Sequence, residues 1–296
     1  MPLVPMRDLL AAALSGGYAV GYFEAWDQYS LEAVLEAAEE CRSPVILGFG
    51  GAMMDQVWFS DGGLRRLAAL GRVTAENARV PVSYLLNEVE TLDHIAEGLA
   101  CGFNAVMLDA SELPLDENIE ATRRVVQAAH AVGADVEGEC DPLPDASGMM
   151  GQRTSKLTAP DEAARYVLAT GVDALSVSIG NEHIRTQGES SPDLDLLPRL
   201  RDAVRVPLVI HGGTGFPEWA VPQAIERGVA KFNVGTVLKR LFFEAVRQSM
   251  HPLPKDPNFQ EIVGSRKPRD FLQQAKLRVK NEVMRRIALY GSPGRA

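Results

Sequence analysis

Eight apolar runs alternate with segments of helical spacing along this chain, and that alternation limits the possible fold more than any other feature. Between several of the runs, as in residues 30–41, 117–133 and 159–171, apolar residues recur every three or four positions, which is typical of amphipathic helices. Strands that alternate with helices form parallel βαβ units, and eight such units close a barrel. The pattern therefore predicts an α/β fold, a (β/α)8 TIM barrel. The apolar runs are residues 18–23, 44–49, 80–86, 105–111, 135–140, 174–180, 207–213 and 231–236.

The whole chain is expected to form one domain. No stretch of linker composition divides residues 1–296, so we predict a single barrel with a basic helical extension over about 252–296. A doubly wound sheet is the alternative, but its first turn usually carries G-x-G-x-x-G, whereas the first run here is followed by EAWDQYS. The Pro/Gly/Ser-rich stretch 141–157 follows the fifth run. In a barrel it would open on the active-site face, where it could act as a mobile lid.

Charge and composition exclude several classes of partner. The formal net charge of -9 argues against nucleic acid or an anionic membrane surface as a ligand. No apolar run reaches the roughly 18–20 residues of a membrane helix, and the first residues lack the basic and apolar regions of a signal peptide. The 3 cysteines form no C-x-x-C motif, which argues against a disulfide framework and a cysteine zinc site. We therefore expect a cytoplasmic protein that acts on a small molecule.

Polar side chains gather at the carboxyl ends of the predicted strands. In a (β/α)8 barrel, these ends face the substrate. His94, His130 and His251 lie instead in helical or tail segments, where an ordinary exposed side chain is expected. The predicted rim consists of Glu24, Asn87, Glu88, Asp109, Ser111, Glu137, Glu139, His183, His211, Asn233 and Thr236.

Two rim histidines and one carboxylate suggest a metal site. His183, His211 and Glu88 match the ligand set of catalytic zinc sites and of 2-His-1-carboxylate iron sites. The glycine-rich residues 212–215 could offer backbone amides to a phosphate. Two alternatives stay open, because His183 could be an ordinary loop residue and Glu88 could merely lie at a favourable helix start.

Segments spread over the whole chain resemble the class II fructose-bisphosphate and tagatose-bisphosphate aldolases. The resemblance implies a TIM barrel, a divalent metal (zinc in most members) and a homodimer or homotetramer. It also implies reversible aldol cleavage of a ketose phosphate through a metal-stabilised enediolate. The segments that carry it are MPLVPMRDLLAAALSGGYAVGYF, SPVILG, GFNAVMLDAS, PLVIHGGTG, KFNVGT and YGSPGRA.

The family's His-Leu-Asp-His-Gly run is altered here. The corresponding residues are Leu85–Val89, so Asn87 replaces the proton-transferring Asp and Glu88 replaces a metal-binding His. His183 and His211 match the other two metal ligands. The resemblance thus implies a His2Glu site, which suits zinc and also manganese or iron.

The loss of the Asp leaves proton transfer without its usual group. The amide of Asn87 can hold a hydroxyl group but cannot take up its proton near neutral pH. Glu24, Glu137 and Glu139 are the candidate bases on the rim, with Glu24 also in the place of a substrate-contacting Asn. The family's acidic loop after the fifth strand reads DPLPDASGMM here, which leaves Asp141 or Asp145 as substitutes for its general acid.

Recognition of phosphate is also expected to differ. Ile184 and Gln187 stand where family members carry Gly and Lys, and Gly235 stands where they carry an Asp. An arginine nearby could bind a phosphate or a carboxylate with two hydrogen bonds. The predicted substrate- or phosphate-binding residues are Arg185, Gly212, Thr214, Asn233 and Thr236.

Three functions fit these observations. The first is a metal-dependent carbon–carbon lyase acting on a ketose phosphate or a related polyol or sugar acid, with specificity changed from fructose-bisphosphate. The second is a metal-dependent epimerase or isomerase on the same scaffold. The third is a non-catalytic protein that binds a sugar phosphate. The retained histidines and the new carboxylate at Glu88 favour an enzyme.

Overall fold

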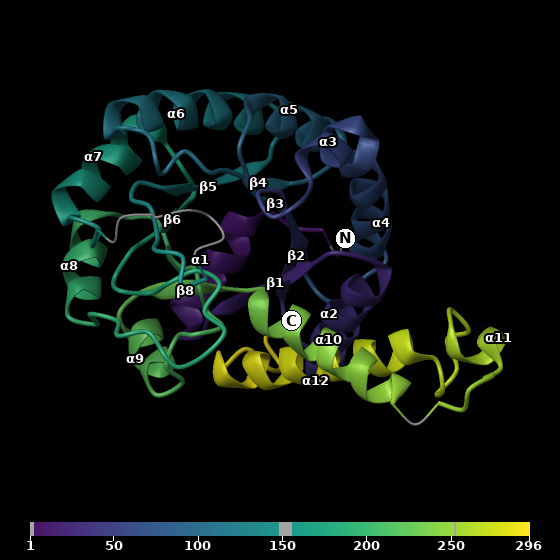
Figure 1. The fold of residues 1–296 in the computed structure, drawn as a ribbon. Helices are drawn as coiled ribbons and strands as arrows, with labels where there is room; N and C mark the ends of the chain where they lie inside the picture. The colour runs from purple at the N-terminus through teal and green to yellow at the C-terminus, as the bar shows by residue number, and fades with distance from the viewer. Residues whose placement is uncertain (1–2, 148–155, 252) are drawn as a thin grey trace.

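Eight parallel strands close into a barrel in chain order in the computed structural model, which describes residues 3–147, 156–251 and 253–296. Helices form an outer ring around this barrel (Figure 1). The predicted (β/α)8 fold is therefore confirmed. The strands are β1 (Val20–Ala25), β2 (Val45–Gly50), β3 (Val82–Val89), β4 (Ala105–Leu108), β5 (Asp135–Glu139), β6 (Ala174–Ser176), β7 (Leu208–Ile210) and β8 (Val229–Val234).

The helices begin and end at residues that suit those positions. Asp27 caps α2 by accepting a hydrogen bond from the Ser30 amide, and Pro160 starts α7, where its missing amide costs nothing. Gly171 ends α7 in the left-handed region that glycine tolerates best. The helices are α1 (Met6–Gly16), α2 (Gln28–Cys41), α3 (Gln56–Trp58), the turn η1 (Phe59–Gly63), α4 (Leu64–Glu76), α5 (Leu92–Ala100), α6 (Leu115–Ala131), α7 (Pro160–Thr170), α8 (Leu196–Ala203), α9 (Ala220–Glu226), α10 (Thr236–Met250), α11 (Phe259–Ile262) and α12 (Phe271–Leu289).

Four strands, β4 to β7, are shorter than the apolar runs that predicted them, and the difference is largest for β6 and β7. β6 ends at Ser176 and β7 at Ile210, although apolar residues continue beyond β6. Val177 and Ile179 are fully buried without belonging to a strand. Hydrophobicity alone cannot separate a buried loop from a strand, so the predicted ends were too late.

The barrel opens at one end only. Side chains from α1, including Met6 and Leu10, form one apolar cluster with inward-facing strand residues such as Ile46 and Leu85. Figure 1 shows α1 in the middle of the ring of strands. Because α1 closes the amino ends of the strands, a substrate can reach the interior only from their carboxyl ends.

The carboxyl-terminal extension packs on the barrel. In α12 the side chains of Ala275, Val279, Val283 and Ile287 recur every four residues and are fully buried. This face contacts α2 and α10. Arg286, also on α12, donates a hydrogen bond to the Gly213 carbonyl oxygen at 2.9 Å. The extension therefore holds the turn that follows β7.

One expectation from the sequence is wrong, and another concerns residues that the structure does not describe. His94 is buried rather than exposed, because it lies on the inner side of α5 against Phe59 and its Nε2 atom is 2.9 Å from the Ser60 hydroxyl. Residues 148–155 of the predicted lid fall outside the described residues. Within the described part of the chain, no helix is both long enough and apolar enough to cross a membrane.

Candidate active site

A cavity of about 260 Å³ lies at the carboxyl ends of the strands. A larger groove, of about 820 Å³, lies between α10, α11 and α12 and shares none of its lining residues with the predicted rim. The polar chemistry therefore belongs to the smaller cavity. It is lined by Tyr22, Glu24, Met53, Asn87, Glu88, His183, Ile184, His211, Gly212, Thr214, Asn233, Val234, Gly235, Thr236 and Lys239.

Glu88, His183 and His211 come together on one side of this cavity. One possible ligand atom from each lies within 4.8 Å of the others, an arrangement that could hold a metal ion. The Glu88 Oε1 atom is 2.8 Å from His211 Nδ1 and 3.7 Å from His183 Nε2. Three protein ligands with two imidazoles and one carboxylate fit a catalytic zinc site, which keeps a further position for water or substrate.

A local distortion lets Asn87 and Glu88 reach the same cavity. Neighbouring side chains in a regular strand point to opposite faces, so Asn87, like Leu85, faces the barrel interior and Glu88 should face outward. Glu88 instead has a φ of 50°, in the left-handed region, and the pairing of β3 with β4 shifts register there. Such a backbone costs on the order of 1–3 kcal/mol in a non-glycine residue and persists only where its surroundings hold it.

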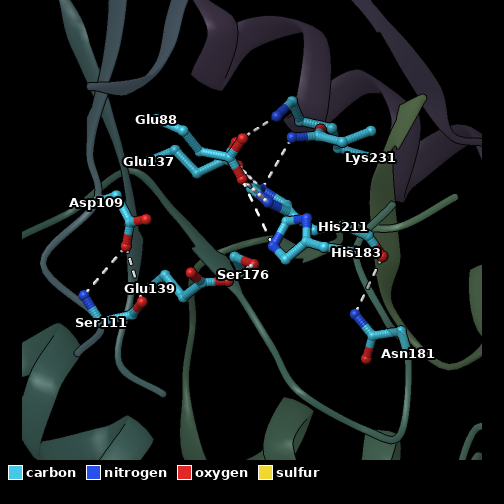
Figure 2. A network of polar contacts seen from close by, with 11 residues as sticks. Glu88, Asp109, Ser111, Glu137, Glu139, Ser176, Asn181, His183, His211 and Lys231 are labelled. Carbon is cyan, nitrogen blue, oxygen red and sulfur yellow. Dashed lines mark hydrogen bonds and ion pairs between the residues drawn. The ribbon is translucent and has the colours of Figure 1, made fainter. Parts of the chain in front are cut away.

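Behind the metal candidates lies a buried chain of charges (Figure 2). His211 Nε2 is 2.8 Å from Glu137 Oε1, and Glu137 Oε2 accepts a hydrogen bond from Lys231 Nζ at 2.6 Å. Glu137 and Lys231 are both fully buried. A carboxylate behind a histidine fixes the orientation of the ring and raises its basicity as a ligand.

These contacts shift the pKa values of the buried groups. Burial raises the pKa of Glu137, but the charges of Lys231 and His211 together lower it by more. The resulting pKa lies below the ordinary value of a glutamate. Burial lowers the pKa of His211, but the carboxylates of Glu88 and Glu137 raise it to about 10. The two carboxylates therefore favour the protonated form of His211.

The backbone around both histidines is held by hydrogen bonds. Asn181 donates from Nδ2 to the His211 carbonyl oxygen at 3.1 Å. His183 donates its amide to the Pro144 carbonyl at 2.8 Å, and its own carbonyl accepts from the Ala146 amide at 3.0 Å. The loop after β5 therefore pairs with the His183 segment and positions it over the cavity.

Among the described residues, three buried polar atoms in the cavity wall have no hydrogen-bond partner. They are the hydroxyl of Tyr22 and the Oδ1 atoms of Asn87 and Asn233. The three residues are 2%, 3% and 7% exposed. Buried polar atoms are nearly always paired, so these three indicate a polar ligand with oxygen atoms at this place.

Glu24 and Lys239, which also line the cavity, form an ion pair. The Lys239 Nζ atom lies 2.5 Å from Glu24 Oε1. A Cβ atom built on Gly235 would lie 2.1 Å from Glu24 Oε2. The carboxylate of Glu24 therefore fills the space that a side chain at position 235 would occupy, which explains the glycine there.

The predicted site residues are only partly brought together. Glu24, Asn87, Glu88 and both histidines line the cavity, as do Gly212, Thr214, Asn233 and Thr236. Glu139, Asp141, Asp145 and Arg185 do not belong to its lining.

Arg185 and Glu139 are engaged elsewhere. Arg185 Nη2 contacts the two carboxylate oxygens of Glu182 at 2.7 and 2.8 Å. Glu139 accepts a hydrogen bond from the Ser176 hydroxyl at 2.9 Å, and burial raises its pKa to about 8.

Sequence reasoning missed two polar residues of the cavity lining. Lys239 lies three residues after Thr236, one turn along α10, and that helical spacing was the available signal. Tyr22 alternates with Val20 on the inward face of β1, where a tyrosine in an otherwise apolar run was the signal.

Comparisons with known proteins agree with the fold. The family described as "Fructose-bisphosphate aldolase class-II" matches residues 4–295. The chain is 33% identical to a fructose-bisphosphate aldolase of Geobacillus stearothermophilus, covering 100% of this chain and 99% of that protein. It is 34% identical to one of Thermus caldophilus, covering 99% and 100%. The crystal structure of the YdjI aldolase from Escherichia coli K12 superposes with a TM-score of 0.81 at 30% identity, covering 99% of each chain.

Proposed function

The chain belongs to the class II fructose-bisphosphate aldolase family, and on that premise we propose that it is a metal-dependent carbon–carbon lyase with a changed substrate. The proposed reaction is aldol cleavage of a ketose phosphate or of a related polyol or sugar acid, rather than of fructose-bisphosphate. The observation that carries this proposal is the convergence of Glu88, His183 and His211 on a cavity whose wall holds unpartnered polar atoms.

The proposed metal ligands are Glu88, His183 and His211. Two imidazoles and a carboxylate suit zinc first, and manganese or iron as alternatives. A divalent ion bound there would polarise the substrate carbonyl group and favour cleavage of the neighbouring carbon–carbon bond. Glu137 supports this assignment, because by accepting a hydrogen bond from His211 Nε2 it leaves Nδ1 to face Glu88.

Glu24 is the proposed base. Of the three carboxylates considered, Glu24 lines the cavity, whereas Glu137 is tied to Lys231 and Glu139 lies outside the lining. Its carboxylate can take the proton of the substrate hydroxyl that becomes an aldehyde. Asn87 would then hold a substrate hydroxyl through its unpartnered Oδ1 atom.

A changed specificity is supported by the charges of the cavity wall. The ammonium of Lys239 in this wall is already paired with Glu24, and the guanidinium of Arg185, outside the lining, is paired with Glu182. The carboxylate of Glu24 beside Gly235 would also repel a phosphate placed there. We therefore propose that fructose 1,6-bisphosphate is a poor substrate.

An epimerase or isomerase reaction is the second candidate. Asn87 supports it, because the residue that moves the proton in aldol cleavage is missing at this position while Glu24 stays available to move protons between carbon atoms. Product analysis separates the two reactions, since only cleavage yields two smaller molecules.

The test combines metal content with turnover. Elemental mass spectrometry on the wild type, Glu88→Ala and the control Glu117→Ala should find about one zinc, manganese or iron per chain in the first and third only. Glu117 is an exposed carboxylate on the outer helix α6. Each protein is then supplied with ketose bisphosphates, ketose monophosphates, free ketoses and ketose acids, and the carbonyl products are identified.

The outcomes separate the proposals. Cleavage of a substrate other than fructose 1,6-bisphosphate, lost in Glu88→Ala but not in Glu117→Ala, is the expected result. Rapid cleavage of fructose 1,6-bisphosphate would refute the changed specificity. A wild type that binds no metal after reconstitution would refute both enzyme functions and favour a protein that binds a sugar phosphate.

Assembly and location are further proposals. We propose a homodimer or homotetramer, which the exposed side chains of Phe243 on α10 and Phe259 on α11 support, at 64% and 60% exposure. We propose a cytoplasmic location, which the free thiols of Cys41, Cys101 and Cys140 support.

A further inference from the structure

We propose that Tyr22 is a catalytic residue, whose hydroxyl donates a hydrogen bond to the substrate oxygen that gains negative charge during the reaction. The inference rests on the proposed function and adds a residue to its site. Tyr22 belongs to β1, and its side chain points into the barrel with the inward-facing residues of the other strands. Tyr22 lines the same cavity as Glu88 and His211.

The hydroxyl of Tyr22 is buried without serving the fold. The residue is 2% exposed, and its oxygen has no hydrogen-bond partner among the described residues. A buried hydroxyl without a partner destabilises a protein, and a phenylalanine would fill the same space without that cost. The position therefore indicates a partner that arrives from outside, through the cavity.

The surroundings keep this hydroxyl protonated. Burial raises the pKa of Tyr22 well above its usual range, and the carboxylates of Glu24, Glu88 and Glu137 raise it further. The ammonium of Lys231 lies 5.1 Å from the centre of the ring, but Lys231 is bound to Glu137. Tyr22 can therefore donate a hydrogen bond at neutral pH, whereas it cannot act as a proton acceptor.

Two amide oxygens complete the contact. Asn233 is the β8 residue paired with Tyr22, and its Nδ2 atom lies 2.8 Å from His211 Nε2. Its Oδ1 atom, like that of Asn87, has no hydrogen-bond partner within the described part of the chain. One donor and two acceptors in the lining of one cavity can complement a carbonyl oxygen with neighbouring hydroxyl groups. This is the arrangement of an α-hydroxycarbonyl compound, so the substrate part held here is the hydroxyketone end of a sugar.

The hydrogen bond should matter more for rate than for binding. A donor aimed at an oxygen strengthens its bond as negative charge develops there, and removal of one such donor typically lowers kcat by about 10²–10³-fold. Loss of a hydrogen bond in the ground state changes affinity less. If Tyr22 had a purely structural role, removal of its hydroxyl would change neither kcat nor the affinity for substrate.

The test uses Tyr22→Phe, which keeps the ring and its contact with Lys231. The control is Tyr18→Phe, since Tyr18 is 5% exposed and lies just before the amino end of β1, away from the cavity. With metal-loaded proteins and the best substrate, we expect Tyr22→Phe to lose about 10²-fold in kcat, whereas KM should rise only several-fold. The metal content should equal that of the wild type, and the melting temperature should be the same or higher.

A second measurement removes the dependence on turnover. Calorimetric binding of dihydroxyacetone and dihydroxyacetone phosphate should be several-fold weaker for Tyr22→Phe than for the wild type and Tyr18→Phe. Equal kcat and equal affinity in wild type and Tyr22→Phe would overturn the role of Tyr22, as would a wild type that binds neither compound. A wild type that binds but turns over no substrate, with binding weakened in Tyr22→Phe, would overturn the lyase reaction and keep the contact.

Discussion

Replacing Lys231 by methionine tests the buried charges behind the metal site. Lys231 and Glu137 are both fully buried, and the ammonium lies 2.6 Å from the carboxylate. Lys231→Met removes the charge but keeps a side chain of similar length. Glu137 is then left as a buried carboxylate whose remaining charged partner is His211, at 2.8 Å.

The expected cost follows from the loss of one partner of a buried ion pair. Such a loss typically destabilises a protein by about 3–5 kcal/mol, because the other charge stays buried and uncompensated. In a chain of this size we expect a melting temperature lower by on the order of 10 °C. The double variant Lys231→Met/Glu137→Gln removes both charges, so we expect it to be more stable than Lys231→Met alone.

The loss of stability in Lys231→Met should also depend on pH. Without Lys231 the pKa of Glu137 rises, because the ammonium is one of the groups that lower it. A folded-state pKa raised above the unfolded value makes stability fall as pH rises. Lys231→Met should therefore lose more stability at pH 8 than at pH 5.

The measurement is urea unfolding at pH 5 and pH 8, with metal-free proteins. The four proteins are the wild type, Lys231→Met, Glu137→Gln and the double variant. A double-mutant cycle isolates the coupling between the two side chains. Additive effects of the two substitutions, with no dependence on pH, would refute the account of Glu137 and Lys231 as a charge-compensated pair.

Two further predictions concern carboxylates near the cavity. Burial raises the pKa of Glu139 to about 8 from 4.5, so the folded state keeps a proton that the unfolded state loses, and stability falls as pH rises between these values by about 1.36 kcal/mol per unit. Glu139→Gln should therefore gain in melting temperature over the wild type from pH 5 to pH 8, and parallel pH curves would contradict this. Gly235→Ala should push the Glu24 carboxylate away from Lys239, because the new Cβ would lie 2.1 Å from Glu24 Oε2. Turnover should fall at least tenfold (about 1.4 kcal/mol) through misplacement of the base, and unchanged kinetics would show that Glu24 has no part in the reaction.

The architecture was accessible from the sequence because it depends on local patterns. Apolar runs such as 44–49 and helices such as 117–133 are recognisable from periodicity, and eight repeats of that unit leave few closed arrangements. The rule that carboxyl ends of strands face the substrate then placed Glu88, His183 and His211 on one rim before any distance was known. Family resemblance assigned them a common role.

Only the tertiary structure decided which of these side chains meet and which are engaged elsewhere. Glu88 reaches the cavity through a positive φ, which no residue pattern predicted, and Glu137 is bound to Lys231, 94 residues away. Lys239 and Tyr22 line the cavity although the sequence did not predict them there, whereas Arg185 binds Glu182. The physical reason is that strand position follows from hydrophobicity along the chain, whereas the pairing of a charged or polar group depends on distances of a few ångströms between segments far apart in sequence.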